Sequence, residues 1–178
     1  MKVIKIAVWG LGRHALLRVI PAISSVKNLS LIGVYSRNVE SVMKTSSEWG
    51  CFGWLSQKEM LQDPQVDVVY IATPIGIHAE QVAQVLESGK HVWCEKPLTC
   101  CYEDTKRLVS IAKKNNRMLV EAFMYLYHPQ FKKVKSFVDD KNNGYLYSIS
   151  CRFGMPLLEK PGFRYQSSLG GGALWDIA

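Results

Sequence analysis

The first two thirds of the chain alternate between short apolar runs and segments that carry apolar residues at helical spacing. The apolar runs predict strands buried on both faces at 3–8, 29–36, 66–72, 91–94 and 117–121, with a shorter strand at 51–54. The segments between them predict helices at 15–26, 39–49, 79–88 and 102–114. Alternation of this kind predicts an α/β fold with a parallel, doubly wound sheet.

The pattern changes at an aromatic stretch, 123–131. A predicted helix at 130–139 follows, and residues 145–153 then alternate between apolar and polar side chains, as in the first strand of a new sheet. We therefore expect one domain at 1–122. Residues 123–178 are expected to be the truncated start of a second α/β domain with an antiparallel sheet.

A glycine turn follows the first predicted strand. It reads Gly10-Leu11-Gly12-Arg13-His14-Ala15, which is G-x-G-x-x-A between a strand and a helix. In a Rossmann domain Gly10 permits the tight turn, Gly12 admits a pyrophosphate, and Ala15 lets the helix pack closely. Free N–H groups at the helix start bind phosphates, and Arg13 is assigned to the same cofactor site. The alternative is a glycine turn that binds nothing.

The end of the second predicted strand bears on the choice of cofactor. An NAD enzyme places an acidic residue there to bind the ribose 2′-hydroxyl, whereas this chain has Ser36 and Arg37. A hydroxyl and a guanidinium suit a 2′-phosphate, because arginine grips phosphate through paired hydrogen bonds. The sequence therefore favours NADP, with NAD possible. The alternative is that Arg37 is a solvated residue at a helix start.

A polar turn, Thr73-Pro74, follows the strand at 66–72. Ligands bind at the carboxyl ends of strands in open α/β sheets, so both residues are assigned to the cofactor site. His78 lies a few residues further on and is predicted to contact the ribose or the nicotinamide side. A histidine satisfied within the protein structure is the alternative.

The strand at 91–94 leads directly into Glu95-Lys96-Pro97. A lysine at the end of a buried strand, between a carboxylate and a rigid proline, is predicted to face the nicotinamide ring and the substrate. Glu95 is predicted to position this lysine or to contact the cofactor. The alternative for Lys96 is a surface lysine paired with Glu95.

Composition narrows the class of protein. The 178 residues include 48% hydrophobic and 21% charged residues, which is ordinary for globular domains, and the net charge is +7. The basic residues are scattered, so nucleic acid is not an expected partner. There is neither a signal peptide nor an apolar run near the ~18 residues that cross a membrane. Five cysteines without metal-ligand spacing indicate reduced thiols, a cytoplasmic location and no metal site.

Taken together, the motifs resemble the glucose–fructose oxidoreductase / inositol dehydrogenase / MocA family of NAD(P)-dependent oxidoreductases. The matching segments are Gly10-Leu11-Gly12, Ala72-Thr73-Pro74 with His78, Cys94-Glu95-Lys96-Pro97-Leu98, Glu121-Ala122-Phe123-Met124-Tyr125 with His128-Pro129-Gln130, and Gly170-Gly171-Gly172-Ala173-Leu174 with Asp176. The last two segments look most like the D-xylose dehydrogenase / dihydrodiol dehydrogenase branch, which is NADP-linked.

The resemblance implies a Rossmann domain followed by a domain on an open, mostly antiparallel sheet that commonly forms a homo-oligomer contact. It implies that Lys96 is the active-site lysine and Asp176 the substrate-side carboxylate. The family's remaining catalytic residue, Tyr or His, would lie beyond Ala178, so the C-terminal part is expected to be missing. Leu126 stands where the branch normally has arginine, and Gln166 replaces a common aspartate.

The predicted function is therefore that of an NADP-dependent oxidoreductase of sugars, polyols or dihydrodiols, with hydride transfer between a substrate C–OH group and nicotinamide. Because half of the predicted active site would be missing, this chain alone is expected to be weakly active or inactive. The alternative function is a non-catalytic NADP-binding regulator or sensor, since the family that the chain resembles includes such a protein.

Overall fold

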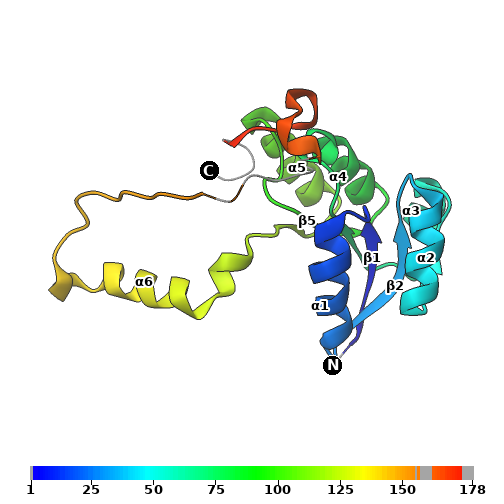
Figure 1. Ribbon diagram of the computed structural model, residues 1–178, viewed down its shortest axis with the longest axis horizontal. Helices are drawn as coiled ribbons and strands as arrows, with labels where there is room; N and C mark the ends of the chain where they lie inside the picture. The colour runs from blue at the N-terminus through cyan, green and yellow to red at the C-terminus, as the bar shows by residue number, and fades with distance from the viewer. Residues whose placement is uncertain (1, 155, 157–161, 174–178) are drawn as a thin grey trace.

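The computed structural model describes residues 2–154, 156 and 162–173, and its centre is one six-stranded sheet (Figure 1). The strands are β1 (Ile4–Trp9), β2 (Leu29–Tyr35), β3 (Phe52–Gly53), β4 (Val68–Ile71), β5 (His91–Cys94) and β6 (Leu119–Glu121). They lie in the order β3-β2-β1-β4-β5-β6, and each runs parallel to its neighbours. The predicted doubly wound parallel sheet is confirmed, and its chain order reverses between β1 and β4.

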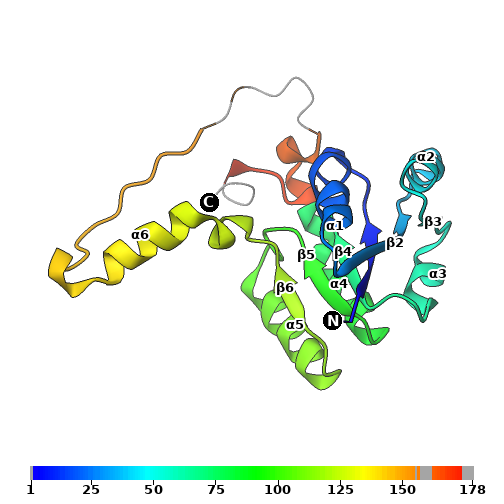
Figure 2. The ribbon, with the colours of Figure 1, turned by 90° about the horizontal axis from the view of Figure 1, so that it is seen from below.

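Helices cover both faces of this sheet (Figures 1 and 2). They are α1 (Ile20–Ser25), which continues a π-helical stretch at Ala15–Val19, α2 (Val39–Trp49), α3 (Gln57–Gln62), α4 (His78–Glu87) and α5 (Tyr102–Lys114). Alternate residues of one strand enter opposite cores: Val8 packs with α1 and α2, whereas Ala7 packs with α4 and α5. The near-continuous apolar strands therefore arise because both of their faces are buried.

Two local signals explain where helices change or begin. Proline has no N–H to donate, and the helix after β1 changes from π-helical to α-helical just before Pro21. Ser56 precedes α3, and its hydroxyl accepts a hydrogen bond from the backbone N–H of Glu59 at 3.2 Å.

The chain after β6 leaves the sheet. Helix α6 (Pro129–Asp139) projects away from it, and an extended stretch of chain follows (Figures 1 and 2). The prediction of a strand at 145–153 is not realised, because this segment pairs with no other strand within the described residues. A strand needs a neighbour for its backbone hydrogen bonds, and alternation of side chains alone does not supply one.

The last described residues, Gly162–Ala173, are called the return segment here. Its second short helical turn, Ser167–Leu169, packs against the loop that follows β4, and its first, Gly162–Tyr165, packs against the second. A Cβ atom on Gly76 of that loop would lie 2.9 Å from the backbone of Leu169, so the two backbones are in direct contact. The glycine turn of the return segment therefore lies at the carboxyl ends of the Rossmann strands.

Candidate functional site

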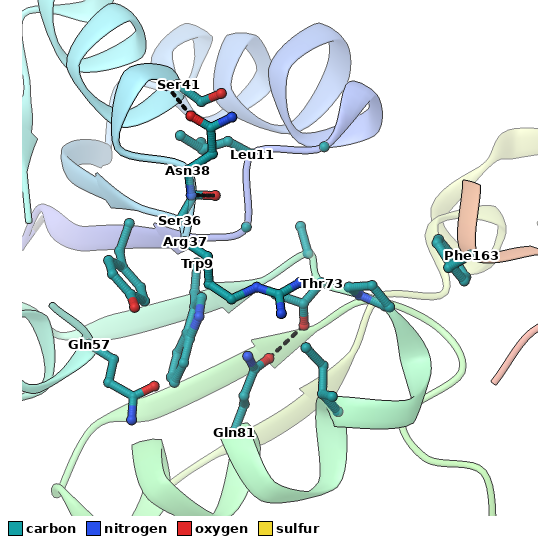
Figure 3. A pocket seen from close by; sticks show the side chains of 16 residues that line it. Trp9, Leu11, Ser36, Arg37, Asn38, Ser41, Gln57, Thr73, Gln81 and Phe163 are labelled. Atoms are coloured by element: carbon teal, nitrogen blue, oxygen red, sulfur yellow. Dashed lines mark hydrogen bonds between the residues drawn. The ribbon is translucent and has the colours of Figure 1, made fainter. Parts of the chain in front are cut away.

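A cleft of about 390 Å³ opens at the carboxyl ends of β1, β2 and β4 (Figure 3). This edge is where the strand order reverses, which is where open α/β sheets bind ligands. The cleft is lined by Trp9, Gly10, Leu11, Gly12, Tyr35, Ser36, Arg37, Asn38, Ser41, Gln57, Ala72, Thr73, Pro74, Ile77, Gln81 and Phe163. Most of the residues assigned to the cofactor from sequence therefore line one cleft.

The glycine turn has the geometry that a pyrophosphate needs. Gly10 has φ +105°, and a Cβ there would lie 2.8 Å from the carbonyl oxygen of Ala72, so only glycine fits. A Cβ on Gly12 would meet nothing within 4 Å, which leaves open space for a phosphate beside the backbone. Ala15 is buried under the helix, as its packing role requires. These residues fit a dinucleotide, whereas Arg13 is exposed and does not line the cleft.

The residues after β2 form the end of the cleft where the sequence predicts the adenosine half of the cofactor. Asn38 caps α2, because its side-chain oxygen accepts a hydrogen bond from the backbone N–H of Ser41 at 3.0 Å. Ser36 and Arg37 line the cleft beside it (Figure 3). None of the described residues that line the cleft is acidic, and Arg37 is the basic residue among them. This charge balance favours a phosphate over a bare ribose hydroxyl.

The loop after β4 is fixed by side chains on α4. The hydroxyl of Thr73 donates to the side-chain oxygen of Gln81 at 2.5 Å, and both residues line the cleft. Pro74 lines it as well. Sequence reasoning did not single out Gln81, because it is one polar position on an amphipathic helix; only its contact with Thr73 distinguishes it.

His78 is fully buried and does not line the cleft, so the predicted contact with the cofactor is not found. Its Nε2 lies 2.8 Å from the carbonyl oxygen of Thr73, and its Nδ1 lies 3.0 Å from that of Pro97. Burial lowers the pKa of His78, and the two carbonyl oxygens oppose this shift. His78 thus joins the loop after β4 to the loop after β5. This is the alternative given above, a histidine whose hydrogen bonds are satisfied within the protein.

Glu95 stands at the centre of a polar cluster. Its carboxylate accepts a hydrogen bond from the hydroxyl of Tyr70 and lies 3.0 Å from Nε2 of His14. Burial is the main cause that raises the pKa of Tyr70, and the negative charge of Glu95 adds to it. Glu95 does not line the cleft. It connects the ends of β4 and β5 to the first turn of the helix after β1. Its predicted role in positioning Lys96 or contacting the cofactor stays a prediction.

Lys96 is half-buried in the turn after β5 and lies outside the residues that line the cleft. The backbone on both sides of it is fixed. The N–H of Glu95 donates to the carbonyl oxygen of Ile71 at 2.9 Å, and the N–H of Leu98 donates to the carboxylate of Glu121 at 2.7 Å. Lys96 therefore has a defined place at the sheet edge, next to the cofactor cleft.

The second predicted catalytic residue, Asp176, lies outside the described residues. The glycine turn that precedes it packs against the same sheet edge, since a Cβ on Gly170 would lie 2.9 Å from both Sγ of Cys100 and Cβ of Ile75. Cys100 follows Lys96 by four positions. The return segment is therefore brought to the loop that carries Lys96. Within the described part of the chain, no group of His, Cys, Asp or Glu could hold a metal ion.

Residues 4–123 match the profile of a family described as the oxidoreductase family with an NAD-binding Rossmann fold, GFO/IDH/MocA. The chain belongs to this family. Its members bind NAD or NADP, and the open Gly12 turn and the acid-free cleft of this chain fit such a cofactor.

Curated relatives include a dTDP-3,4-didehydro-2,6-dideoxy-alpha-D-glucose 3-reductase of Saccharopolyspora spinosa, 35% identical over 176 residues that are 99% of this chain and 53% of the relative. A trans-1,2-dihydrobenzene-1,2-diol dehydrogenase of Xenopus laevis is 34% identical over 122 residues, 68% of this chain and 37% of the relative. Dihydrodiol dehydrogenases are thus among the relatives, as predicted. The keto-sugar reductases, which sequence reasoning did not name, match over a longer stretch.

Among solved structures, KijD10 of Actinomadura kijaniata, a 3-ketoreductase in complex with NADP and TDP-benzene, aligns with a TM-score of 0.92 at 32% identity. The alignment covers 99% of this chain and 54% of KijD10. The chain spans about half the length of the curated relatives it matches. Within its described residues, no helix is long and apolar enough to cross a membrane.

Proposed function

We propose that this chain forms the NADP-binding part of an oxidoreductase that interconverts a carbonyl and a hydroxyl group on a sugar-like substrate. The observation that carries the proposal is the acid-free cleft at the strand-order reversal, with Arg37 at one end and the Lys96 turn beside it. Support comes from family membership and from relatives named as dehydrogenases and ketoreductases.

The preference for NADP rests on the cleft after β2. Arg37 is exposed along the cleft and has no acidic neighbour among the described residues that line it. A 2′-phosphate there gains charge-assisted hydrogen bonds from the guanidinium, with Ser36 as a second donor. A free 2′-hydroxyl finds no carboxylate to accept its hydrogen bond, so NAD binds more weakly.

When bound, the reduced cofactor supplies the hydride. Lys96 donates a hydrogen bond to the substrate carbonyl oxygen and delivers the proton that this oxygen needs as it becomes a hydroxyl. In the opposite direction Lys96 accepts that proton. The hydrogen bonds on either side of Lys96 hold its backbone at the sheet edge, and Asp176 is assigned by resemblance to orient the substrate.

The substrate class is that of a keto sugar, by the names of the relatives. Several are reductases of a dTDP-linked keto sugar, and KijD10 is a 3-ketoreductase solved with a TDP compound. Reduction of a sugar ketone with NADPH is therefore the proposed direction. Oxidation of sugars, polyols or dihydrodiols is the same chemistry reversed, and the Xenopus relative supports it.

The test is calorimetric titration of the 178-residue chain with NADPH and with NADH. We expect NADPH to bind more tightly, and Arg37→Ala to weaken NADPH binding about 10- to 100-fold because a charge-assisted hydrogen bond is lost. The affinity for NADH should change little. Arg152→Ala, at an exposed arginine that does not line the cleft, is the control. Equal binding of both cofactors would contradict the proposed NADP preference.

A further inference from the structure

One residue that lines the cofactor cleft comes from outside the Rossmann domain. Among the described residues in the cleft lining, all but Phe163 belong to positions 9–81. Phe163 lies on the return segment, more than 80 positions further along the chain.

The return segment holds Phe163 in place through its own backbone. The N–H of Gln166 donates to the carbonyl oxygen of Phe163 at 2.8 Å, and the N–H of Gly172 donates to that of Arg164 at 2.9 Å. A Cβ on Gly171 would lie 2.4 Å from the carbonyl oxygen of Phe163, so glycine is required for this close turn. The guanidinium of Arg164 lies 5.2 Å from the ring centroid and supports the ring.

The return segment is also fixed against the sheet edge. Gly76 meets the backbone of Leu169, and Gly170 meets Cys100 and Ile75 at distances that leave no room for a side chain. Both Ile75 and Gly76 belong to the turn between Pro74 and Ile77, two residues of the cleft lining. The wall that carries Phe163 is therefore built onto the cleft through direct backbone contacts.

The position of Phe163 along the cleft indicates which half of a dinucleotide it faces. Ser36 and Arg37 occupy the adenosine end, and the glycine turn after β1 is the place of the pyrophosphate. In Figure 3 Phe163 lies beyond Thr73, on the side away from Ser36. The far end of the cleft, past the pyrophosphate position, is left for the nicotinamide half.

We propose that Phe163 is a cofactor-binding residue whose ring packs against the nicotinamide half of NADP. The inference rests on the proposed function, since it takes NADP as the ligand of the cleft. An aromatic side chain suits this place because it offers a large, rigid apolar surface to a heteroaromatic ring. The cofactor is thus held from two sides: by the Rossmann domain at the adenosine end and by the return segment at the other.

The test compares two ligands by calorimetry on the 178-residue chain: NADPH and adenosine 2′,5′-bisphosphate, which lacks the nicotinamide half. Phe163→Ala is expected to raise the Kd for NADPH roughly tenfold, as loss of an aromatic stacking partner does. The Kd for the bisphosphate should not change. Phe163→Tyr keeps the ring and should stay within about twofold of the wild type. Phe153→Ala removes a ring that is 70% exposed outside the cleft and is the matched control.

A second variant shifts the return segment and leaves the side chain of Phe163 unchanged. Gly76→Ala places a methyl group against the backbone of Leu169 and forces the return segment to move. It is expected to raise the Kd for NADPH about as much as Phe163→Ala. Combining the two substitutions should add little, because both remove the same contact. Gly154→Ala, where a Cβ meets nothing within 4 Å, is the control.

The outcomes separate this inference from the proposed function. If the wild type binds neither ligand, the NADP function itself is wrong. If the wild type binds NADPH and Phe163→Ala binds it equally well, the role of Phe163 is refuted. A loss of affinity that is equal for NADPH and the bisphosphate would also refute it, because the ring would then not act at the nicotinamide half.

Discussion

Residues 2–122 and residues 123–154 differ in how they dispose of their apolar side chains. In the first region the strands bury alternate residues in two cores, so that Val8 and Ala7 are both fully buried. In the second region no described residue is buried, and Phe137 on α6 is 64% exposed. Both regions contain amphipathic helices, so amphipathicity alone does not decide whether a helix packs.

The difference comes from connectivity. Each of the strands β1 to β5 is followed by a helix that returns over the sheet, so a helix and the strands it covers are close in sequence and pack together. Helix α6 follows β6, the last strand among the described residues, and these offer it no further parallel strand to return to. An apolar helix face is stabilised only when a partner surface covers it, and the described residues supply α6 with little more than the ring of Tyr125 against Phe131.

The largest expected effect is a loss of stability, and it is tested by truncating one leucine in each region. Leu108 is fully buried on α5, and Leu108→Ala should lower the free energy of unfolding by about 2–5 kcal/mol, because it leaves a cavity in the core. Leu146 in the second region is 57% exposed, and Leu146→Ala should change the free energy of unfolding by less than about 0.5 kcal/mol. Urea unfolding followed by circular dichroism measures both. Equal losses would mean that the second region shares the stability of the first.

The next effect concerns backbone conformation. Gly10→Ala forces a side chain into φ +105° and toward the carbonyl oxygen of Ala72, so we expect a loss of about 1–3 kcal/mol in unfolding free energy. Gly154→Ala has open space around it and should be neutral. Thermal unfolding of the two variants side by side measures the difference. A neutral Gly10→Ala variant would show that the turn after β1 tolerates a side chain.

The smallest effect is a pH dependence carried by the first region. Burial lowers the pKa of His78, so the unfolded chain binds a proton more readily than the folded one. Stability should therefore fall as the pH drops below about 6.5. His78→Gln should flatten this slope between pH 5.5 and 8. The pKa of the less buried His91 is lowered in the same sense, so His91→Gln should flatten the slope less. An unchanged slope in both variants would exclude histidine as its source.

Much of the first region follows from the sequence because its signals are local. The strand at 91–94 and the helices at 39–49 and 102–114 coincide with the observed elements, since each depends on periodicity within a few turns. The glycine turn and the Ser36-Arg37 pair were also predicted to lie in one site, because parallel strands end at one edge. The strand at 145–153 was not realised, since strand formation requires a partner outside the segment.

The sequence by itself therefore determined the parallel sheet, its glycine turn and the residues at the strand ends. Only the tertiary structure decided which side chains meet across that edge. His78 was predicted to contact the cofactor, but it is buried and links two loops. The register of β4 beside β5 placed Tyr70 against Glu95. Phe163 joined the cleft only because the return segment packs beside Gly76. Contacts between distant residues depend on packing geometry, which a local pattern does not encode.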